Sequence, residues 1–302
     1  MYSIVLSLVP LIGLILIGYF LKQKSYLTDE FWAGAEKFNY FVFFPAMLFG
    51  NLAQADIHME MVSKILVILL VVFPIACAVL YILKRIFQIP TRRFGVYVQS
   101  NVRFNTYIGL AVVASLFPAE GMTIFALLLA ISIPVVNIIS VLALTDHENM
   151  NFRAVIISLL KNPLILGCLV GVLYNVSGLP LWKGAESLIY QLAICSLPMG
   201  LMCVGAALQF VALKKESFPL MINTLSRLCL MPILAWLVCK MLGFNALETQ
   251  IFILYFALPT ASAAYILTKV LGGDSQLMAG VISLQIIGAA ITLPIVLTLI
   301  LH

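Results

Sequence analysis

The segment Gln99–Gly109 reads QSNVRFNTYIG, and seven of its eleven residues are polar or glycine even when the tyrosine is not counted. It lies in the middle of an apolar stretch, residues 94–116, that is long enough to cross a hydrocarbon core of about 30 Å. Asparagine, serine and threonine offer the backbone alternative hydrogen bonds, and Gly109 loosens a helix. We therefore predict a membrane helix that is interrupted near Asn105.

A second interruption is predicted in the segment Ala257–Ala264, which reads ALPTASAA and lies in the apolar stretch 248–270. Pro259 removes one backbone donor, and its ring clashes with the preceding helical turn. Pro259 follows Asn105 by 154 positions, and two broken helices at corresponding positions are typical of a transporter's binding site. Each break exposes a half-helix N-terminus with free N–H groups and partial positive charge, which favours an anion.

The chain also repeats its landmarks, which predicts a duplicated module. Three of them recur at a spacing of 153 positions: Pro10-Leu11-Ile12 as Pro163-Leu164-Ile165, Gly18 as Gly171, and Pro45 as Pro198. Duplications of this kind are the building plan of many secondary transporters. The predicted units are two five-helix repeats, residues 1–145 and 158–302, joined by a short cytoplasmic connector, residues 146–157.

Composition indicates that the solvent of this chain is lipid. The chain is 63% hydrophobic and 10% charged, with a mean hydropathy of +1.13, whereas a soluble domain carries about 25% charged residues. A membrane helix needs roughly 20 apolar residues. The predicted fold is therefore an all-α membrane protein with ten transmembrane helices, at residues 2–21, 34–53, 62–83, 94–116, 121–144, 158–178, 185–210, 217–240, 248–270 and 276–301.

Basic residues predict how the ten helices are oriented. Cytoplasmic loops of membrane proteins collect lysine and arginine, and here Lys22 and Lys24 follow the first apolar run while most other basic residues fall in alternate connections. We therefore expect a multi-pass protein of the cytoplasmic (inner) membrane with both termini outside. Because each half has five helices, the second repeat is inverted relative to the first. The net charge of +5 then reflects topology, and no nucleic-acid partner is expected.

Two arginines lie deep in predicted helices. Arg103 is ten residues beyond Arg93, or about 15 Å along a helix at 1.5 Å per residue, and Arg227 lies at a similar depth in the stretch 217–240. A cation at that depth costs at least ~2.5 kcal/mol. Because all twelve acidic residues fall in loops or at helix ends, we expect carbonyl oxygens, water or an anionic ligand to compensate.

The position of the acidic residues also limits the coupling chemistry, since carboxylates inside the membrane are the usual proton or sodium relays. A proton-coupled cycle would need a residue at a helix edge or a proton carried by the substrate itself. The six cysteines fall inside predicted helices without C-x-x-C spacing, and buried cysteines behave as small apolar residues. We expect neither a metal site nor a cofactor.

The candidate substrate-binding residues gather at the two breaks and on the helix that follows the first break. They are Asn101, Arg103, Asn105, Thr106, Tyr107, Asn137, Pro259, Thr260, Ala261 and Ser262, with Asn39 and Arg227 as possible support. Several alternatives are open: Arg103 could snorkel or cap a carbonyl, Arg227 could be satisfied by Asn223, Thr224 and Ser226, Tyr107 could be a gate or a packing aromatic, and Gly167-x-x-x-Gly171 could serve packing or dimerisation.

The sequence resembles bacterial members of the auxin efflux carrier family along nearly its full length. Six motifs carry the resemblance: Pro10-Leu11-Ile12 with Gly18, Phe43-Phe44-Pro45-Ala46, Arg103-x-Asn105-Thr106-x-x-Gly109, Lys161-Asn162-Pro163-Leu164, Ala257-Leu258-Pro259 and Gly272-Gly273-Asp274. The resemblance implies two inverted five-helix repeats in which broken helices four and nine cross, as in bile-acid–sodium symporters and sodium–proton antiporters. It further implies a scaffold of helices 1, 2, 6 and 7, and a transport domain of helices 3–5 and 8–10.

The resemblance also implies a function: family members move organic anions, the bacterial ones malate or malonate, by an elevator-type mechanism and commonly as homodimers. Plant members lack an arginine like Arg103, which favours a compact carboxylate over an indole acid. We therefore predict a secondary transporter of small organic anions. An anion channel and a membrane carboxylate sensor that does not transport are the alternatives. An enzyme is not expected, because the chain has no H-E-x-x-H motif and no pair of carboxylates at the midplane.

Overall fold

The computed structural model describes residues 2–144, 157, 162–208 and 217–301. Within these ranges the chain forms helices joined by short connections, and no strand occurs in them. The helices are α1 (Tyr2–Gln23), α2 (Asp29–Phe38), η1 (Asn39–Phe43), α3 (Phe44–Ala53), α4 (Met59–Ile86), α5 (Thr91–Val102), α6 (Thr106–Leu116), α7 (Ala119–Leu144), α9 (Pro163–Ser177), α10 (Lys183–Ala206), α11 (Ser217–Leu225), η4 (Ser226–Leu230), α12 (Met231–Leu242), α13 (Ala246–Ala257), α14 (Ala263–Val270) and α15 (Ser275–Leu301).

Each of the ten predicted stretches contains helix. Five helical stretches are long and apolar enough by themselves to cross a membrane: Met59–Ile86, Ala119–Leu144, Lys183–Ala206, Phe218–Leu242 and Ser275–Leu301. The predicted bounds differ from the observed ones by a few residues: the second helix begins at Asp29, the third runs from Met59 to Ile86, and the helix in 185–210 runs from Lys183 to Ala206. The described helix in 158–178 begins at Pro163, and residues 158–161 and 209–210 lie outside the described residues. Most of the predicted connector, residues 146–156, lies outside the described residues.

Local sequence explains where several helices begin. Asn162 caps α9, because its Oδ1 accepts hydrogen bonds from the N–H groups of Leu164 (3.0 Å) and Ile165 (3.3 Å), and Pro163 occupies the first turn, where no N–H is needed. The two π-helical turns, η1 and η4, each end just before a helix that has a proline, Pro45 or Pro232, in its first turn. Wider turns of this kind accommodate a helix interruption.

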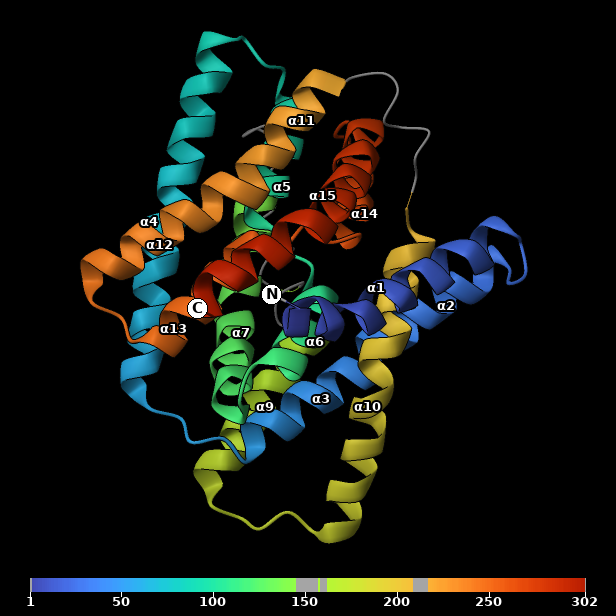
Figure 1. Ribbon diagram of the computed structural model, residues 1–302, viewed down its shortest axis with the longest axis vertical. Coiled ribbons are helices and arrows are strands. Elements are labelled where there is room, and N and C mark those ends of the chain that lie inside the picture. Colours follow the sequence, from blue (N-terminus) through green and yellow to red (C-terminus); the bar gives the residue numbers. More distant parts are fainter. Residues whose placement is uncertain (1, 145–156, 158–161, 209–216, 302) are drawn as a thin grey trace.

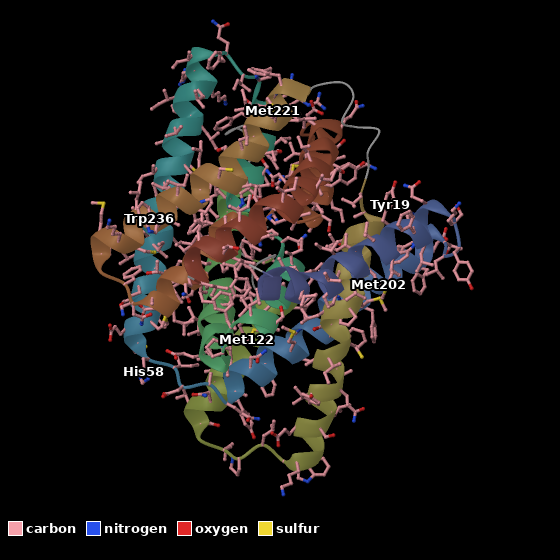
Figure 2. All side chains as sticks on the ribbon, in the orientation of Figure 1. Tyr19, His58, Met122, Met202, Met221 and Trp236 are labelled. Atoms are coloured by element: carbon pink, nitrogen blue, oxygen red, sulfur yellow. The ribbon has the colours of Figure 1, made fainter. Side chains whose placement is uncertain are left out.

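Close helix crossings assemble a first helix group from α1, α2, η1, α3, α9 and α10. A Cβ atom added at Gly18 of α1 would lie 2.0 Å from the carbonyl oxygen of Met202 in α10. A Cβ atom at Gly167 of α9 would lie 2.8 Å from the Cα of Pro45 in α3. Figure 1 shows this group around α1, α2 and α10, and Figure 2 places Tyr19 and Met202 near one another in it.

Gly167-x-x-x-Gly171 therefore serves packing inside the chain, which decides one of the open alternatives. The backbone of α9 approaches α3 so closely that a Cβ atom at Gly171 would lie 3.1 Å from the carbonyl oxygen of Phe49. Small residues at this spacing let two helices meet at short distance.

The second helix group contains α4 to α7 and α11 to α15. In it α5 packs on α7, α13 packs on α12 and α15, and α4 packs on α12. Figure 1 shows α4, α11 and α12 on the opposite side of the molecule from α1, α2 and α10. The two broken helices, α5–α6 and α13–α14, belong to this group, and α6 also contacts α1 and α10.

Hydrogen bonds between the connections show which of them lie at the same end of α4. At the end that follows α4, Arg92 Nε donates to the carbonyl oxygen of Gly272 (2.6 Å) and the N–H of Asp274 donates to that of Arg92 (3.2 Å). At the end that precedes α4, Asn175 Nδ2 donates to the carbonyl oxygen of Ala55 (2.6 Å). The basic connections near Arg92 and Gly272 thus share one end, as the predicted alternation requires.

Candidate functional site

The first predicted interruption is present. Helix α5 ends at Val102, α6 begins at Thr106, and Arg103 between them has an extended backbone (φ −74°, ψ 151°). Asn105 caps the new helix, since its side-chain Oδ1 accepts a hydrogen bond from the N–H of Ile108 (3.1 Å). An N-cap asparagine satisfies one of the free donors of a helix start, so the polar run both stops α5 and starts α6.

The second predicted interruption is also present. Helix α13 ends at Ala257 and α14 begins at Ala263, with an extended backbone at Leu258 (φ −67°, ψ 141°). The N–H of Thr260 donates to Gln285 Oε1 (2.8 Å). No side chain among the described residues caps α14; instead the N–H groups of Ala264 and Tyr265 donate to the carbonyl oxygens of Ala261 (3.1 Å) and Ser262 (3.0 Å).

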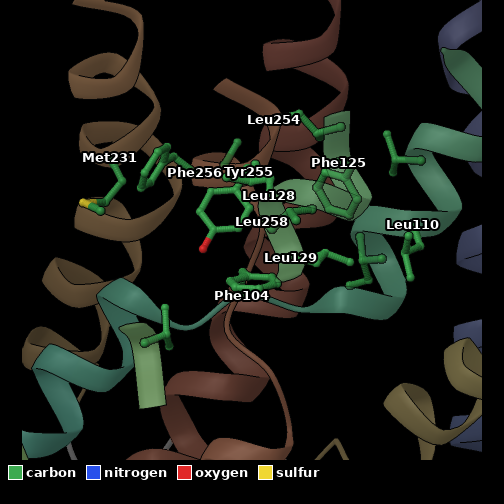
Figure 3. Close-up of a cluster of buried hydrophobic side chains, with 14 of the residues drawn as sticks. Phe104, Leu110, Phe125, Leu128, Leu129, Met231, Leu254, Tyr255, Phe256 and Leu258 are labelled. Carbon is green, nitrogen blue, oxygen red and sulfur yellow. The ribbon is translucent and has the colours of Figure 1, made fainter. Parts of the chain in front are cut away.

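The two breaks meet. The N–H of Asn105 donates to the carbonyl oxygen of Pro259 at 2.7 Å, which joins the backbone of one break to that of the other. Behind this contact the ring of Phe104 lies 4.5 Å from that of Tyr255, within the buried apolar cluster that Figure 3 shows. The crossing of the two breaks therefore packs against buried hydrophobic side chains.

Arg227 lies fully buried under the crossing and binds backbone carbonyls. Its Nη1 donates to Asn101 O (2.6 Å), its Nε to Leu258 O (2.7 Å) and its Nη2 to Tyr255 O (3.2 Å). These carbonyls belong to the C-terminal ends of α5 and α13, which carry partial negative charge. Of the open alternatives, compensation of Arg227 by carbonyl oxygens is the one that the structure shows, and Asn223, Thr224 and Ser226 are not its hydrogen-bond partners.

A buried polar network surrounds Arg227. In it Ser226 Oγ donates to Asn101 Oδ1 (2.9 Å), and Asn101 Nδ2 donates to Tyr97 O (2.9 Å). Gln285 Nε2 donates to Asn223 Oδ1 (3.1 Å). Asn101 was expected in the substrate cup, but both ends of its amide are engaged in this network, so it supports the crossing. Gln285 was missed, although a glutamine in the middle of an apolar helix is itself a signal.

Arg103 points to the other side of the crossing, toward α7. Its Nη2 donates to Asn137 Oδ1 (2.6 Å) and its Nε to Ser140 Oγ (3.2 Å). Among the described residues no carboxylate forms an ion pair with Arg103. Its two hydrogen bonds to α7 use Nη2 and Nε and leave Nη1 out. Asn137 was expected near the first break and is found there; Ser140 was missed, one helical turn further along.

The N-terminal ends of α6 and α14 carry the remaining candidates. Thr106, Ala261 and Ser262 are partly exposed, whereas Thr260 is buried. The buried hydroxyl of Thr260 has no hydrogen-bond partner within the described part of the chain. These positions combine the hydroxyls of Thr106, Thr260 and Ser262 with the partial positive charge of two helix N-termini, which is an arrangement that holds anions.

Tyr107 and Asn39 connect the site to the first helix group. The ring of Tyr107 stacks on that of Phe44 in α3, with centroids 4.6 Å apart and planes 7° apart. Asn39 Nδ2 donates to the carbonyl oxygen of Ser196 in α10 (3.0 Å). A Cβ atom at Gly200 of α10 would lie 2.9 Å from Asn39 Nδ2 and 3.1 Å from the Tyr107 ring. Tyr107 is thus a packing aromatic at the boundary between the groups.

The carboxylate of Glu36 contacts the second break, and this contact was not anticipated from the sequence. Ser262 Oγ donates to Glu36 Oε1 at 3.3 Å. Glu36 belongs to α2 at the edge of the predicted helix 34–53, and no feature of the sequence indicated that this edge folds against the second break. Elsewhere, no group of three or more metal-ligating side chains occurs in the described ranges.

Comparisons with known proteins agree with this architecture. The family model described as "Membrane transport protein" matches residues 3–297. A curated relative, an uncharacterized transporter of Methanothermobacter thermautotrophicus, is 23% identical over 297 residues, and the match covers 96% of each chain.

Proposed function

The chain belongs to the membrane transport protein family, and we propose that it is a secondary transporter that carries small organic anions across the cytoplasmic membrane. The observation that carries the proposal is Arg103, a half-buried guanidinium beside two helix breaks with no carboxylate partner in the described chain. A cation in that position is costly unless an opposite charge joins it. An anionic substrate supplies that charge.

Electrostatics favour an anion on one side of the crossing only. Arg227 already binds the carbonyls at the C-terminal ends of α5 and α13, so the negative ends of the half-helices are compensated. The N-terminal ends of α6 and α14 keep their partial positive charge, and Arg103 lies beside the first of them. The net potential at the breaks is therefore positive.

Carboxylates fit the donors that the site offers. A guanidinium presents parallel N–H groups that match the two oxygens of a carboxylate. In our proposal Arg103 holds the carboxylate and Asn137 orients Arg103. Thr106, Thr260 and Ser262 supply hydroxyl donors, Ala261 supplies its backbone N–H, and Asn105 supplies its side-chain amide. Pro259 and Tyr107 shape the site, and Asn39, Asn101 and Arg227 hold it in place.

We further propose that the ten helical stretches form two inverted repeats that move by alternating access. Helix packing supports a repeat, because three pairs of contacts correspond to one another under the shift of about 153 residues: α1 with α10 and α9 with α3, α5 with α15 and α13 with α7, α4 with α5 and α12 with α13. The first helix group would be the scaffold and the second group the elevator, with both termini outside and a homodimer as the assembly.

The direct test is binding and uptake in proteoliposomes with a panel of mono- and dicarboxylates. Arg103→Ala should raise the Kd of the tightest-binding carboxylate roughly 10- to 100-fold, since a hydrogen bond to a charged group contributes about 1.5–3 kcal/mol. Arg85→Ala is the matched control, because Arg85 is exposed and bonds to the hydroxyl of Tyr81. Unchanged affinity in folded Arg103→Ala protein would remove the arginine from the site.

The same vesicles separate the alternatives. A carrier gives uptake that saturates with substrate and exchanges internal for external anion. Single-channel currents would indicate an anion channel instead, and binding without flux would indicate a sensor.

A further inference from the structure

Glu36 occupies an unusual place for a carboxylate in this chain. It lies on α2, and its Oε1 accepts a hydrogen bond from Ser262 Oγ (3.3 Å) at the second break. The contact therefore joins the first helix group to the second, at a residue that we propose to hold the substrate. A carboxylate beside a site for anions weakens that site unless its charge is removed.

A cavity of about 210 Å³ adjoins this contact. It is lined by Glu36 from α2, Ala207 after α10, Ser262 and Tyr265 at α14, and Ala279 and Ile282 from α15 among others. The cavity lies between the two helix groups, and it is large enough to hold water beside the Glu36 carboxylate and the second break. Such water could deliver a proton to Glu36. Glu36 is the one acidic side chain in this lining.

Among the described residues, the groups that face Glu36 do not neutralise it. The phenol of Tyr107 of α6 and the thiol of Cys203 of α10 interact with it electrostatically, and in their ordinary form these groups carry no charge at neutral pH. Tyr265 of α14 lines the same cavity. On its own helix, Asp29 pairs with Lys22, and Lys37 is exposed. The lining from α15 is apolar, and within the described ranges none of the ion pairs includes Glu36. Lys269 of α14 is exposed, and Lys214, Lys215 and Glu216 lie outside the described residues.

We propose that Glu36 is the proton-coupling residue of this transporter, an inference that rests on the proposed transport of anions. Protonation converts the Glu36 carboxylate into a neutral acid, which removes the repulsion between Glu36 and the carboxylate that binds at the breaks. By linkage, a bound anion favours the protonated acid to the same extent. One proton and one anion therefore bind together, and both are released together on the other side.

The position of Glu36 also ties protonation to movement. Its partner Ser262 belongs to the second helix group, while Glu36 belongs to the first, so displacement of one group against the other separates the two side chains. The charged carboxylate accepts the Ser262 hydrogen bond, and the neutral acid accepts it more weakly. Protonation accordingly loosens the contact when substrate is bound and lets the loaded group move.

Glu36→Gln is the test, since glutamine keeps the shape and has no charge. With malate or malonate as the probe, whichever binds tighter, the wild-type Kd should rise by up to about tenfold per pH unit as Glu36 becomes charged. In Glu36→Gln the Kd should stay at its low-pH value across the range. In sodium-free vesicles loaded with a pH dye, substrate-dependent acidification should fall at least about tenfold while anion exchange continues.

Glu30→Gln is the matched control, because Glu30 is an exposed acid on the same helix and leaves any titration of the probe itself unchanged. Thermal unfolding of each variant in detergent checks that it is folded. If Glu36→Gln keeps the wild-type pH dependence and proton movement, the coupling role is overturned while transport stands. Uptake driven by sodium without proton movement would overturn it as well, and wild-type protein that binds no carboxylate would overturn the proposed function itself.

Discussion

Two arginines at a similar predicted depth have different surroundings, and this difference organises the site. Arg227 binds three backbone carbonyls and is fully buried, whereas Arg103 binds one amide and one hydroxyl and is partly exposed. The sequence marked both as cations that need compensation. It assigned Arg103 to the substrate and Arg227 to support, but it could not name the acceptors of Arg227, because these are main-chain oxygens of α5 and α13, which have no signature in the side-chain sequence.

Replacing Arg227 with methionine should destabilise the fold. The carbonyls of Asn101, Tyr255 and Leu258 would lose their donor, and an unsatisfied buried acceptor costs about 1–3 kcal/mol. We expect the melting temperature in detergent to fall by at least about 5 °C, with partial recovery in Arg227→Lys. Arg85→Met, at an exposed arginine, should change it little. A melting temperature equal to that of wild type would mean that Arg227 does not hold the crossing.

At the scale of elements, the sequence located both helix breaks. Residues that stop one helix and start the next are local signals: Asn105 caps α6 through its own side chain, and Pro259 cannot donate to the preceding turn. The close approach of α1 to α10 was not predicted from the same sequence. Gly18 and Gly205 make it possible, but a glycine in an apolar helix does not state which helix it meets.

Two glycines of α1 offer a matched pair of substitutions. A Cβ atom at Gly18 would lie 2.0 Å from the Met202 carbonyl oxygen, whereas at Gly13 it would meet nothing within 4 Å. Gly18→Ala should therefore push α1 from α10 and cost about 1–3 kcal/mol, and Gly13→Ala should be neutral or stabilising by up to about 1 kcal/mol. Thermal unfolding of the purified variants measures both. Equal melting temperatures would contradict the crossing of α1 with α10.

At the scale of the whole molecule, two helix groups meet at the breaks. Tyr107 stacks on Phe44, and Ser262 bonds to Glu36, so each broken helix contacts the first group near its interruption. Relative movement of the two helix groups would have to break or shift these two contacts. Arg92 and Gly272 lie at the same end of the molecule, as expected if successive connections alternate between the two sides of the membrane. Which end faces the cytoplasm is open to experiment.

Single cysteines in a cysteine-free background test that orientation. We expect a membrane-impermeant maleimide to label Asp56→Cys and Lys183→Cys in intact cells, and Lys24→Cys and Lys269→Cys only after permeabilisation. The reason is that basic connections remain on the cytoplasmic side and that five helices per half invert the second repeat. Labelling of Lys24→Cys in intact cells would reverse the topology, and mismatched halves would contradict the inverted repeat.

The sequence by itself determined the lipid environment, the helical stretches, the two interruptions and the presence of deep cations. These follow from composition, proline and side-chain capping, which act within a few residues along the chain. Only the tertiary structure decided that Arg227 binds backbone carbonyls while Arg103 binds Asn137 and Ser140 of α7. It also decided that Asn101 is bonded in the network around Arg227 and that Glu36 reaches Ser262. Each of these depends on which segments distant in sequence come into contact, and packing of whole helices sets those contacts.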